Sequence, residues 1–242
     1  MKKAFTLAEV LITLGVVGVV AALTIPMLIS RYNEIVTVSK VKEAYSIFSQ
    51  ASKRWQDEFD CLDDISACIS GCAPHSSCNL SEFVKYMKVS DVIYKGDGID
   101  RSKKYWLADK YALALDGTSG ASYWGVNKYD NLYSVQLLLP NGVSAVLMID
   151  TFAKNLPIFL DVNNSAKPNR IGVDVFPISI GAYNNNFYRG LNPYYGEDGS
   201  GGPDKGLCAT RNGHICSPDD GHSPTAYIIK HGKLFDLKKL GY

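Results

Sequence analysis

Six cysteines are the residues whose type and spacing most clearly suggest chemistry, and all of them follow an apolar N-terminal stretch: Cys61, Cys68, Cys72, Cys78, Cys208 and Cys216. An even number of cysteines outside the reducing cytosol is typical of disulfides. The isolated pair Cys208 and Cys216 is predicted to form one disulfide. The four upstream cysteines allow three pairings, between which the sequence does not choose. Zinc is the alternative, because Cys72-x-x-His75-x-x-Cys78 offers suitable ligands.

A second short segment carries side-chain oxygens at alternate positions. Asp161, Asn163 and Ser165 follow one another in this way, and Asp174 can add a further carboxylate. Calcium prefers such oxygen ligands, so these residues are candidate calcium ligands. The segment is not an EF-hand, because Ala166 replaces the glycine at position six and the closing glutamate is missing. An Asx-rich turn needs no metal, so the sequence favours a plain turn and predicts no cofactor, with calcium as the alternative.

The remaining candidates for catalysis are four scattered histidines: His75, His214, His222 and His231. They lie in predicted loops, and the chain contains neither a Gly-x-Ser-x-Gly elbow nor a His-Glu-x-x-His motif. The net charge of +1 gives no basic field for nucleic acid. The sequence therefore predicts that the chain is not an enzyme and has no specific nucleic-acid site.

Glu9 is the single charge in an otherwise apolar stretch that covers residues 4–30. A lone carboxylate in a membrane helix costs about 2.5–3.5 kcal/mol, so a partner is expected to offset it. Residues 10–30 are uncharged and give about 31 Å of helix, which matches a hydrocarbon core of about 30 Å. Lys2 and Lys3 before the stretch favour a cytoplasmic N-terminus.

A secretory signal peptide is one alternative interpretation, with a cut near Val20-Ala21-Ala22. Glu9 and the length of the apolar run beyond that cut argue against it. A plain signal anchor is the other alternative.

Helical patterning continues past Arg31. A narrow apolar seam with a period near 3.5 includes Val38, Val41, Tyr45, Phe48 and Trp55. The pattern predicts one helix from about Phe5 to Glu58, roughly 80 Å long, whose second half packs on a sheet. Pro26 is predicted to kink or locally melt this helix.

Residues 2–12, Lys-Lys-Ala-Phe-Thr-Leu-Ala-Glu-Val-Leu-Ile, resemble the processing motif of type IV pilins and type II secretion pseudopilins. In that family a membrane peptidase removes a short basic leader, and the new N-terminal residue is methylated. The resemblance implies a leader at residues 1–4, cleavage between Ala4 and Phe5, N-methylation of Phe5, and an assembly role for Glu9. The chain departs from the family at Ala4, usually Gly, and at Ala8, usually a larger aliphatic residue.

Cleavage before Phe5 would create an amine whose ordinary pKa is about 7.7–8.0. Glu9 lies four residues further on, within helical reach of its own amine or that of a neighbouring subunit. Such a pair would neutralise both charges and set the axial register between subunits.

The resemblance also implies partners and a location. The partners are other pilins, the prepilin peptidase/methyltransferase, the inner-membrane assembly platform, the assembly ATPase and the lipid bilayer. The subunit would begin in the bacterial inner membrane as a single-pass protein with a periplasmic head, and would end in a pilus, pseudopilus or at the cell surface. Segment 161–176 further resembles part of pilin-like heads, some of which bind calcium.

The predicted fold class is α+β and pilin-like. A membrane or filament-core helix (5–30) and an amphipathic half (31–58) precede a head (59–242). The head divides into a Cys-rich connecting region (59–104), an antiparallel β-meander (105–162) and a loop-rich C-terminal region (163–242).

Within the head we expect strands at 105–115, 132–139, 143–149 and 156–162. The turn Pro140-Asn141-Gly142 is expected to be of type I′, and Pro157 to confine its strand to an edge or a strand start. A closing hairpin is expected at 226–237.

These features predict a structural subunit of a type IV pilus or of a type II secretion pseudopilus. The alternative is a membrane-anchored extracytoplasmic enzyme or binding module that uses the helix only as a tether.

Overall fold

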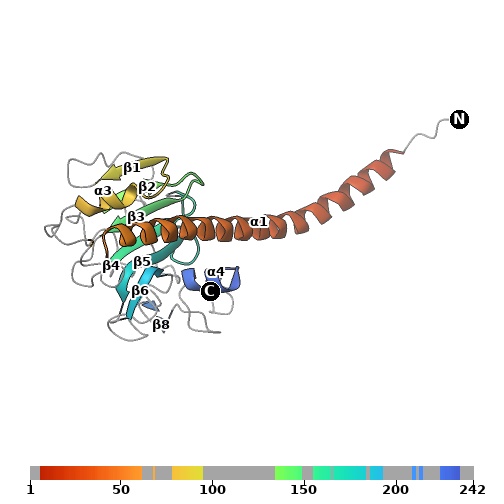
Figure 1. The fold of residues 1–242 in the computed structure, drawn as a ribbon. Coiled ribbons are helices and arrows are strands. Elements are labelled where there is room, and N and C mark those ends of the chain that lie inside the picture. Colours follow the sequence, from red (N-terminus) through yellow and green to blue (C-terminus); the bar gives the residue numbers. More distant parts are fainter. Residues whose placement is uncertain are drawn as a thin grey trace. The chain divides into compact units, whose positions relative to one another are not determined.

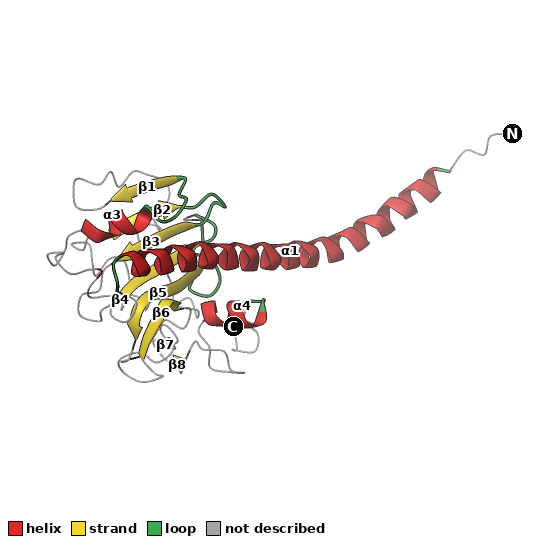
Figure 2. Cartoon of the chain, in the orientation of Figure 1, coloured by secondary structure: helices red, strands yellow, loops and turns green. Residues whose placement is uncertain are grey.

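The computed structural model describes residues 6–61, 68, 78–94, 134–148, 155–164, 166–183, 186–192, 209–210, 213–214 and 224–234. The chain divides into two compact units, residues 1–37 and residues 38–242. A long N-terminal helix and an antiparallel sheet make up most of the described structure (Figure 2). The predicted α+β class is therefore confirmed.

The first helix, α1 (Leu7–Glu58), covers both of the predicted helical halves without a break. Pro26 lies inside it, so the prediction of local melting at Pro26 is wrong. The carbonyl that loses its helical donor through Pro26 is that of Ala22, four residues earlier. A kink at Pro26 stays a prediction.

The second half of α1 buries one face, as the period of the seam predicts. The buried residues of α1 are Val38, Val41, Ala44, Phe48, Ala51, Ser52, Trp55 and Gln56. Tyr45 is partly buried against the same core. The small residues Ala44, Ala51 and Ser52 bring the helix backbone close to the residues it packs on, and these were not part of the predicted seam.

Six strands form one antiparallel sheet whose order in space is their order in the chain (Figure 1). They are β1 (Asp91–Tyr94), β2 (Ser134–Leu138), β3 (Ser144–Met148), β4 (Asn155–Asp161), β5 (Val175–Tyr183) and β6 (Asn186–Asn192). The predicted meander is thus present but extends beyond 105–162 at both ends. The strand expected at 105–115 lies outside the described residues. A separate pair joins β7 (Ala209–Thr210) to β8 (Gly213–His214).

The turn between β2 and β3 differs from the expected type I′. Gly142 N donates to Leu139 O at 3.0 Å, which closes a four-residue turn with Pro140 second. Gly142 has a positive φ of 79°, whereas Asn141 is not among the residues with positive φ. Proline fixes φ near −65°, which suits the second position of a type I turn. The result is a three-residue loop with glycine in the left-handed region.

Pro157 lies in β4, which is an interior strand rather than an edge. The ladder between β4 and β3 begins only at Ile158, so Pro157 pairs on one side alone, with Ser179 of β5. Pro177 of β5 is similar, because the ladder with β6 covers only residues from Ser179 onward. Each proline therefore avoids the position where a ladder N–H is required.

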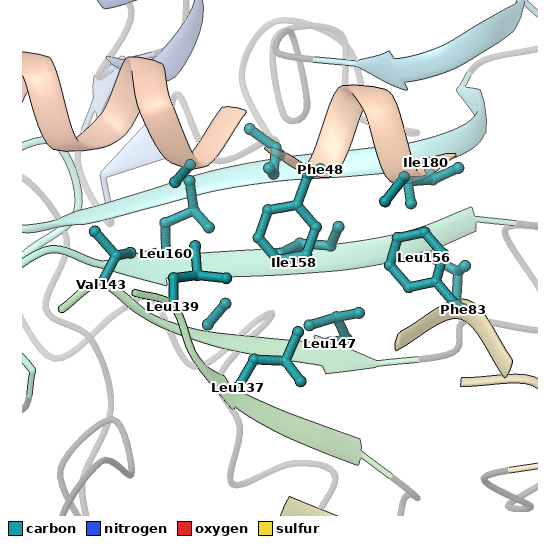
Figure 3. Close-up of a cluster of buried hydrophobic side chains, with 14 of the residues drawn as sticks. Phe48, Phe83, Leu137, Leu139, Val143, Leu147, Leu156, Ile158, Leu160 and Ile180 are labelled. Carbon is teal, nitrogen blue, oxygen red and sulfur yellow. The ribbon is translucent and has the colours of Figure 1, made fainter. Parts of the chain in front are cut away.

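The core of the second unit lies between α1, one face of the sheet and α3 (Cys78–Val84) (Figure 3). Phe48 of α1 stacks on Phe83 of α3 at a centroid distance of 6.4 Å. Trp55 meets the same ring edge-on at 5.2 Å. The strands contribute alternate residues such as Leu147 and Ile158, as expected for a sheet that faces a core on that side.

The C-terminal segment expected to be a hairpin is instead a helix, α4 (Pro224–His231). Proline at the first helical position is favourable because its missing N–H has no helical partner there. Thr225 Oγ1 donates to Pro177 O at 2.6 Å and fixes the helix on β5. Gly232 ends the helix with φ 68°, and its N–H donates to Ile228 O at 2.8 Å. This proline and this glycine are the sequence signals that indicate a helix.

Helix α1 ends at a left-handed residue that is not glycine. Asp60 has φ 50°, and Cys61 N donates to Gln56 O at 3.0 Å, which is the hydrogen bond of a Schellman cap. Cys61 then forms a disulfide with Cys68, with 5.6 Å between the two Cα atoms. The disulfide therefore holds the chain directly after the cap.

Candidate functional site

Glu9 is held by a reciprocal pair of hydrogen bonds at the start of α1. The backbone N–H and the hydroxyl of Thr6 donate to Glu9 Oε2 at 2.9 and 2.8 Å. In return the Glu9 N–H donates to Thr6 Oγ1 at 3.3 Å. This arrangement is a capping box, in which Thr6 is the N-cap. The sequence prediction for Glu9 did not include Thr6, although Thr-x-x-Glu before an apolar run is the signature of this motif.

The carboxylate is favourably placed for electrostatic reasons as well. Glu9 lies in the first turn of α1, where the N–H groups lack helical partners and the helix dipole is positive. The hydrogen bonds described at Glu9 use a single carboxylate oxygen, Oε2. Part of the cost of placing this charge in an apolar helix is therefore offset by the chain itself.

The first unit exposes its apolar side chains. Between Leu7, which is 80% exposed, and Ile35, which is 58% exposed, large aliphatic residues lie open on all sides of the helix. Among the described residues, α1 is long and apolar enough to cross a membrane. A signal sequence meets the same criterion of length and composition. Such a surface needs lipid or other apolar helices around it.

The apolar run ends in polar and aromatic residues. Arg31 Nη1 lies 3.5 Å from Glu34 Oε2, an exposed pair that contributes little stability. Tyr32 is 66% exposed. An arginine and a tyrosine at this point are typical of the boundary between membrane and water.

Two side chains of the second half of α1 fasten it to one end of the interior strands of the sheet. Lys40 Nζ donates to Val162 O at 2.7 Å, just after β4. Asn141 Nδ2, in the turn between β2 and β3, donates to Glu43 Oε2 at 3.1 Å. Polar contacts at this end of the strands thus complement the apolar packing of the seam.

The segment between β4 and β5 is organised by its two carboxylates. Asp161 Oδ1 accepts the backbone N–H groups of Asn163 and Asn164, both at 3.0 Å. Asn164 has φ 57°, a left-handed conformation that asparagine tolerates. The alternating oxygens of the sequence therefore build an Asx turn.

Asp174 is the centre of the same segment. Its Oδ2 accepts Asn163 Nδ2 at 3.0 Å and Asn169 N at 2.8 Å, while Oδ1 accepts Arg170 N at 2.5 Å. Only 3% of Asp174 is exposed. Burial raises the pKa of Asp174 above its ordinary value, and the hydrogen bonds from Arg170, Asn169 and Asn163 oppose that rise.

The structure thus brings together two of the candidate calcium ligands, Asn163 and Asp174, by a direct hydrogen bond. Asp161 lies at the start of the same segment, and Ser165 lies outside the described residues. Within the described ranges, no group of three or more His, Cys, Asp or Glu side chains could hold a metal ion. Among the described residues, however, no donor bonds to three buried amide oxygens: Asn163 Oδ1, Asn164 Oδ1 and Asn169 Oδ1.

The cysteines are only partly described. Cys61 pairs with Cys68, which is one of the three pairings that the sequence left open. Cys72, Cys208 and Cys216 lie outside the described residues, as do His75 and the side chain of Cys78. The Cys208–Cys216 disulfide and the zinc alternative therefore stay untested predictions.

The residues of the predicted processing site, Ala4 and Phe5, also lie outside the described residues. His231 was expected in a loop but is the last residue of α4. The centroid of its ring lies 4.4 Å from that of the Tyr227 ring.

Comparison with known proteins gives no relative. No family model, no curated protein and no solved structure matches the chain.

Proposed function

We propose that the chain is a structural subunit, a pilin or pseudopilin, of a type IV pilus or type II secretion pseudopilus. Its leader would be removed between Ala4 and Phe5, and its N-terminal helix would pass from the membrane into the core of a filament. The head, residues 59–242, would cover the outside together with the amphipathic half of the helix. In this proposal the work of the protein is assembly by packing, and cleavage, methylation and the assembly motor belong to its partners.

One observation carries the proposal. Glu9, in the first turn of α1, is the single charged residue from Leu7 to Ser30, and the large apolar side chains of this stretch are exposed. A tether would gain only a helix cap from a charge at that position, whereas a helix that must find a register against copies of itself also gains an ionic partner there. The processing motif around Ala4 and Phe5 supports the same function by resemblance.

The first experiment is the mass of the mature N-terminus, measured on protein from native membranes. The proposal expects a chain that begins at Phe5 and carries one methyl group. A chain that still begins at Met1 would favour the tethered enzyme or binding module. A chain that begins near residues 22–25 would indicate a secreted domain.

The second experiment separates assembly from folding. Glu9→Gln keeps the shape of the side chain but removes its charge, and we expect the loss of surface filaments with the head still folded. Removing one partner of a buried charge pair costs about 3–5 kcal/mol, enough to prevent assembly. Glu34→Gln, in the exposed pair with Arg31, is the matched control and should assemble. Normal filaments from Glu9→Gln would contradict the proposal.

A further inference from the structure

The segment after β4 contains candidate calcium ligands, and the donors that surround its carboxylates show whether they are available to an ion. Calcium takes six to eight oxygen ligands at about 2.3–2.6 Å, and carboxylates supply the charge that sets its affinity. A carboxylate oxygen that already accepts N–H groups presents hydrogens where the ion would have to lie. The arrangement of donors therefore distinguishes a calcium loop from a hydrogen-bonded turn.

Asp174 accepts three hydrogen bonds from protein donors. Oδ2 accepts two N–H groups, from the Asn163 side chain and the Asn169 backbone, and Oδ1 accepts the Arg170 N–H. A buried carboxylate needs such donors or a cation, and here the donors come from residues of the same segment.

Asp161 is used in the same way. Its Oδ1 accepts the backbone N–H groups of Asn163 and Asn164. The side chain is fully buried, so these bonds are shielded from water and are correspondingly strong.

A positive charge does reach this segment, and it comes from α1. Lys40 Nζ donates to Val162 O at 2.7 Å. Backbone carbonyls of this kind are common calcium ligands. In this protein the carbonyl next to Asp161 instead binds an ammonium group from α1.

The unpaired amide oxygens of Asn163, Asn164 and Asn169 do not make a calcium site by themselves. They are neutral, and the affinity of a calcium loop rises with the number of charged ligands.

We infer that residues 161–164 and 166–175 form a clasp that needs no calcium. In it, backbone N–H groups and the Asn163 amide donate to the carboxylates of Asp161 and Asp174, and the Lys40 ammonium donates to the Val162 carbonyl. The clasp joins the end of β4, the start of β5 and α1. This inference concerns the second unit alone and does not depend on the proposed function.

The first test is thermal unfolding of the full chain in detergent micelles with its disulfides intact. The midpoint is measured in excess EDTA, then with calcium well above the range of about 10⁻⁴–10⁻³ M in which extracellular modules bind, and with magnesium as the control. We expect the same midpoint in all three. A midpoint that rises with calcium until it saturates, and does not rise with magnesium, would overturn the inference.

The second test removes the Lys40 ammonium group, which we propose takes the place of calcium at the Val162 carbonyl. Lys40→Met keeps the aliphatic stem and should lower the midpoint in EDTA by roughly 3–10 °C, the range for loss of a charged hydrogen bond in a unit of this size. Lys167→Met, an exposed lysine of the same segment, is the matched control and should leave it unchanged. If Lys40→Met leaves the midpoint unchanged, as Lys167→Met should, Lys40 does not have the role that we propose.

Asp174→Asn provides an independent check, because it replaces one of the two carboxylate oxygens by an NH2 group, which would face at least one N–H group that now donates there. We expect a lower midpoint in EDTA that calcium does not restore. An unchanged midpoint would show that the hydrogen bonds to Asp174 do not stabilise the segment. Should this variant fail to fold, the calcium response of the wild type and the effect of Lys40→Met still decide the inference.

Discussion

Thr6 and Glu9 cap each other: the Thr6 hydroxyl donates to Glu9 Oε2 at 2.8 Å and accepts the Glu9 N–H at 3.3 Å. The carboxylate that suggests a contact between subunits is therefore already stabilised within its own chain. An amine from a neighbouring subunit would have to add to this arrangement or replace it. The strength of the cap thus bears on how easily Glu9 can exchange partners.

The cap can be tested with Thr6→Val, which keeps the shape of threonine but removes its hydroxyl. Loss of an N-cap hydroxyl typically costs about 0.5–2 kcal/mol. We expect faster amide hydrogen exchange at Glu9 and Val10, whose N–H groups bond to Thr6. Thr6→Ser should restore protection. Thr13→Val is the control, because the Thr13 hydroxyl bonds only to carbonyls within the helix, those of Glu9 and Val10.

The seam of α1 makes a second prediction. Phe48 is fully buried between the sheet and Phe83, so Phe48→Ala should lower the free energy of unfolding by about 3–5 kcal/mol. Lys53→Ala, on the exposed face of the same helix, should change it by less than about 0.5 kcal/mol. Urea unfolding followed by tryptophan fluorescence measures both. Equal effects of the two substitutions would mean that α1 does not pack on the sheet in solution.

The sequence predicted those parts of the fold that arise from regular patterns. The helical period placed Val38, Phe48 and Trp55 on one buried face, and alternating apolar residues located β2, β3 and β4. These patterns are local, and burial of a continuous core requires them. Glu9 stood out as a candidate for a related reason, since a lone charge in an apolar run is visible without a structure.

The features of the fold that the sequence analysis missed depend on contacts with other residues or on local sequence signals that compete with one another. The Asn141-Gly142 pair suggested a type I′ turn, but the preceding Pro140 favours type I. The apolar residues of α4 fit a strand as well as a helix, and Pro224 and Gly232 decide between them. At the candidate calcium site, the spacing of residues identified oxygen-bearing side chains. It did not show that the Asn163 amide and the backbone N–H groups of Asn169 and Arg170 converge on Asp174.

The C-terminal cap of α1 makes a third prediction, because Asp60 occupies a left-handed conformation that favours glycine. Asp60→Gly should raise the free energy of unfolding by up to about 1 kcal/mol, since the steric penalty of the side chain is removed. The greater freedom of glycine in the unfolded chain reduces the gain. Chemical unfolding with the Cys61–Cys68 disulfide intact measures the change.

The equivalent position in α4 provides the opposite control. Gly232 has φ 68°, and a Cβ there would lie 3.1 Å from Lys42 Nζ, the mobile end of a side chain. Gly232→Ala should therefore destabilise mainly through backbone strain, by about 1 kcal/mol. If Asp60→Gly and Gly232→Ala changed the free energy of unfolding in the same direction, the left-handed conformation would not be the cause of these changes.

Tyr86 and Glu58 join the turn after α3 to the last residue of α1, and their contact makes a prediction about pH. Partial burial of the phenol, a hydrogen bond to Glu58, and the charges of Glu58 and Glu82 raise the pKa of Tyr86 to about 12. The ordinary value is about 10. Because the pKa is raised in the folded state, the contribution of Tyr86 to stability is complete below about pH 10. It is lost as the pH rises through about 12.

The titration of Tyr86 can be isolated as the difference in tyrosinate absorbance between the wild type and Tyr86→Phe. We expect the midpoint of this difference near pH 12. Glu58→Gln should move it toward lower pH, because the amide removes the negative charge that opposes ionisation of the phenol. Below pH 10, Tyr86→Phe should cost about 1 kcal/mol for the lost hydrogen bond, and this difference should shrink at more alkaline pH. A difference curve centred near pH 10 would show that the phenol is neither shielded nor bound to Glu58.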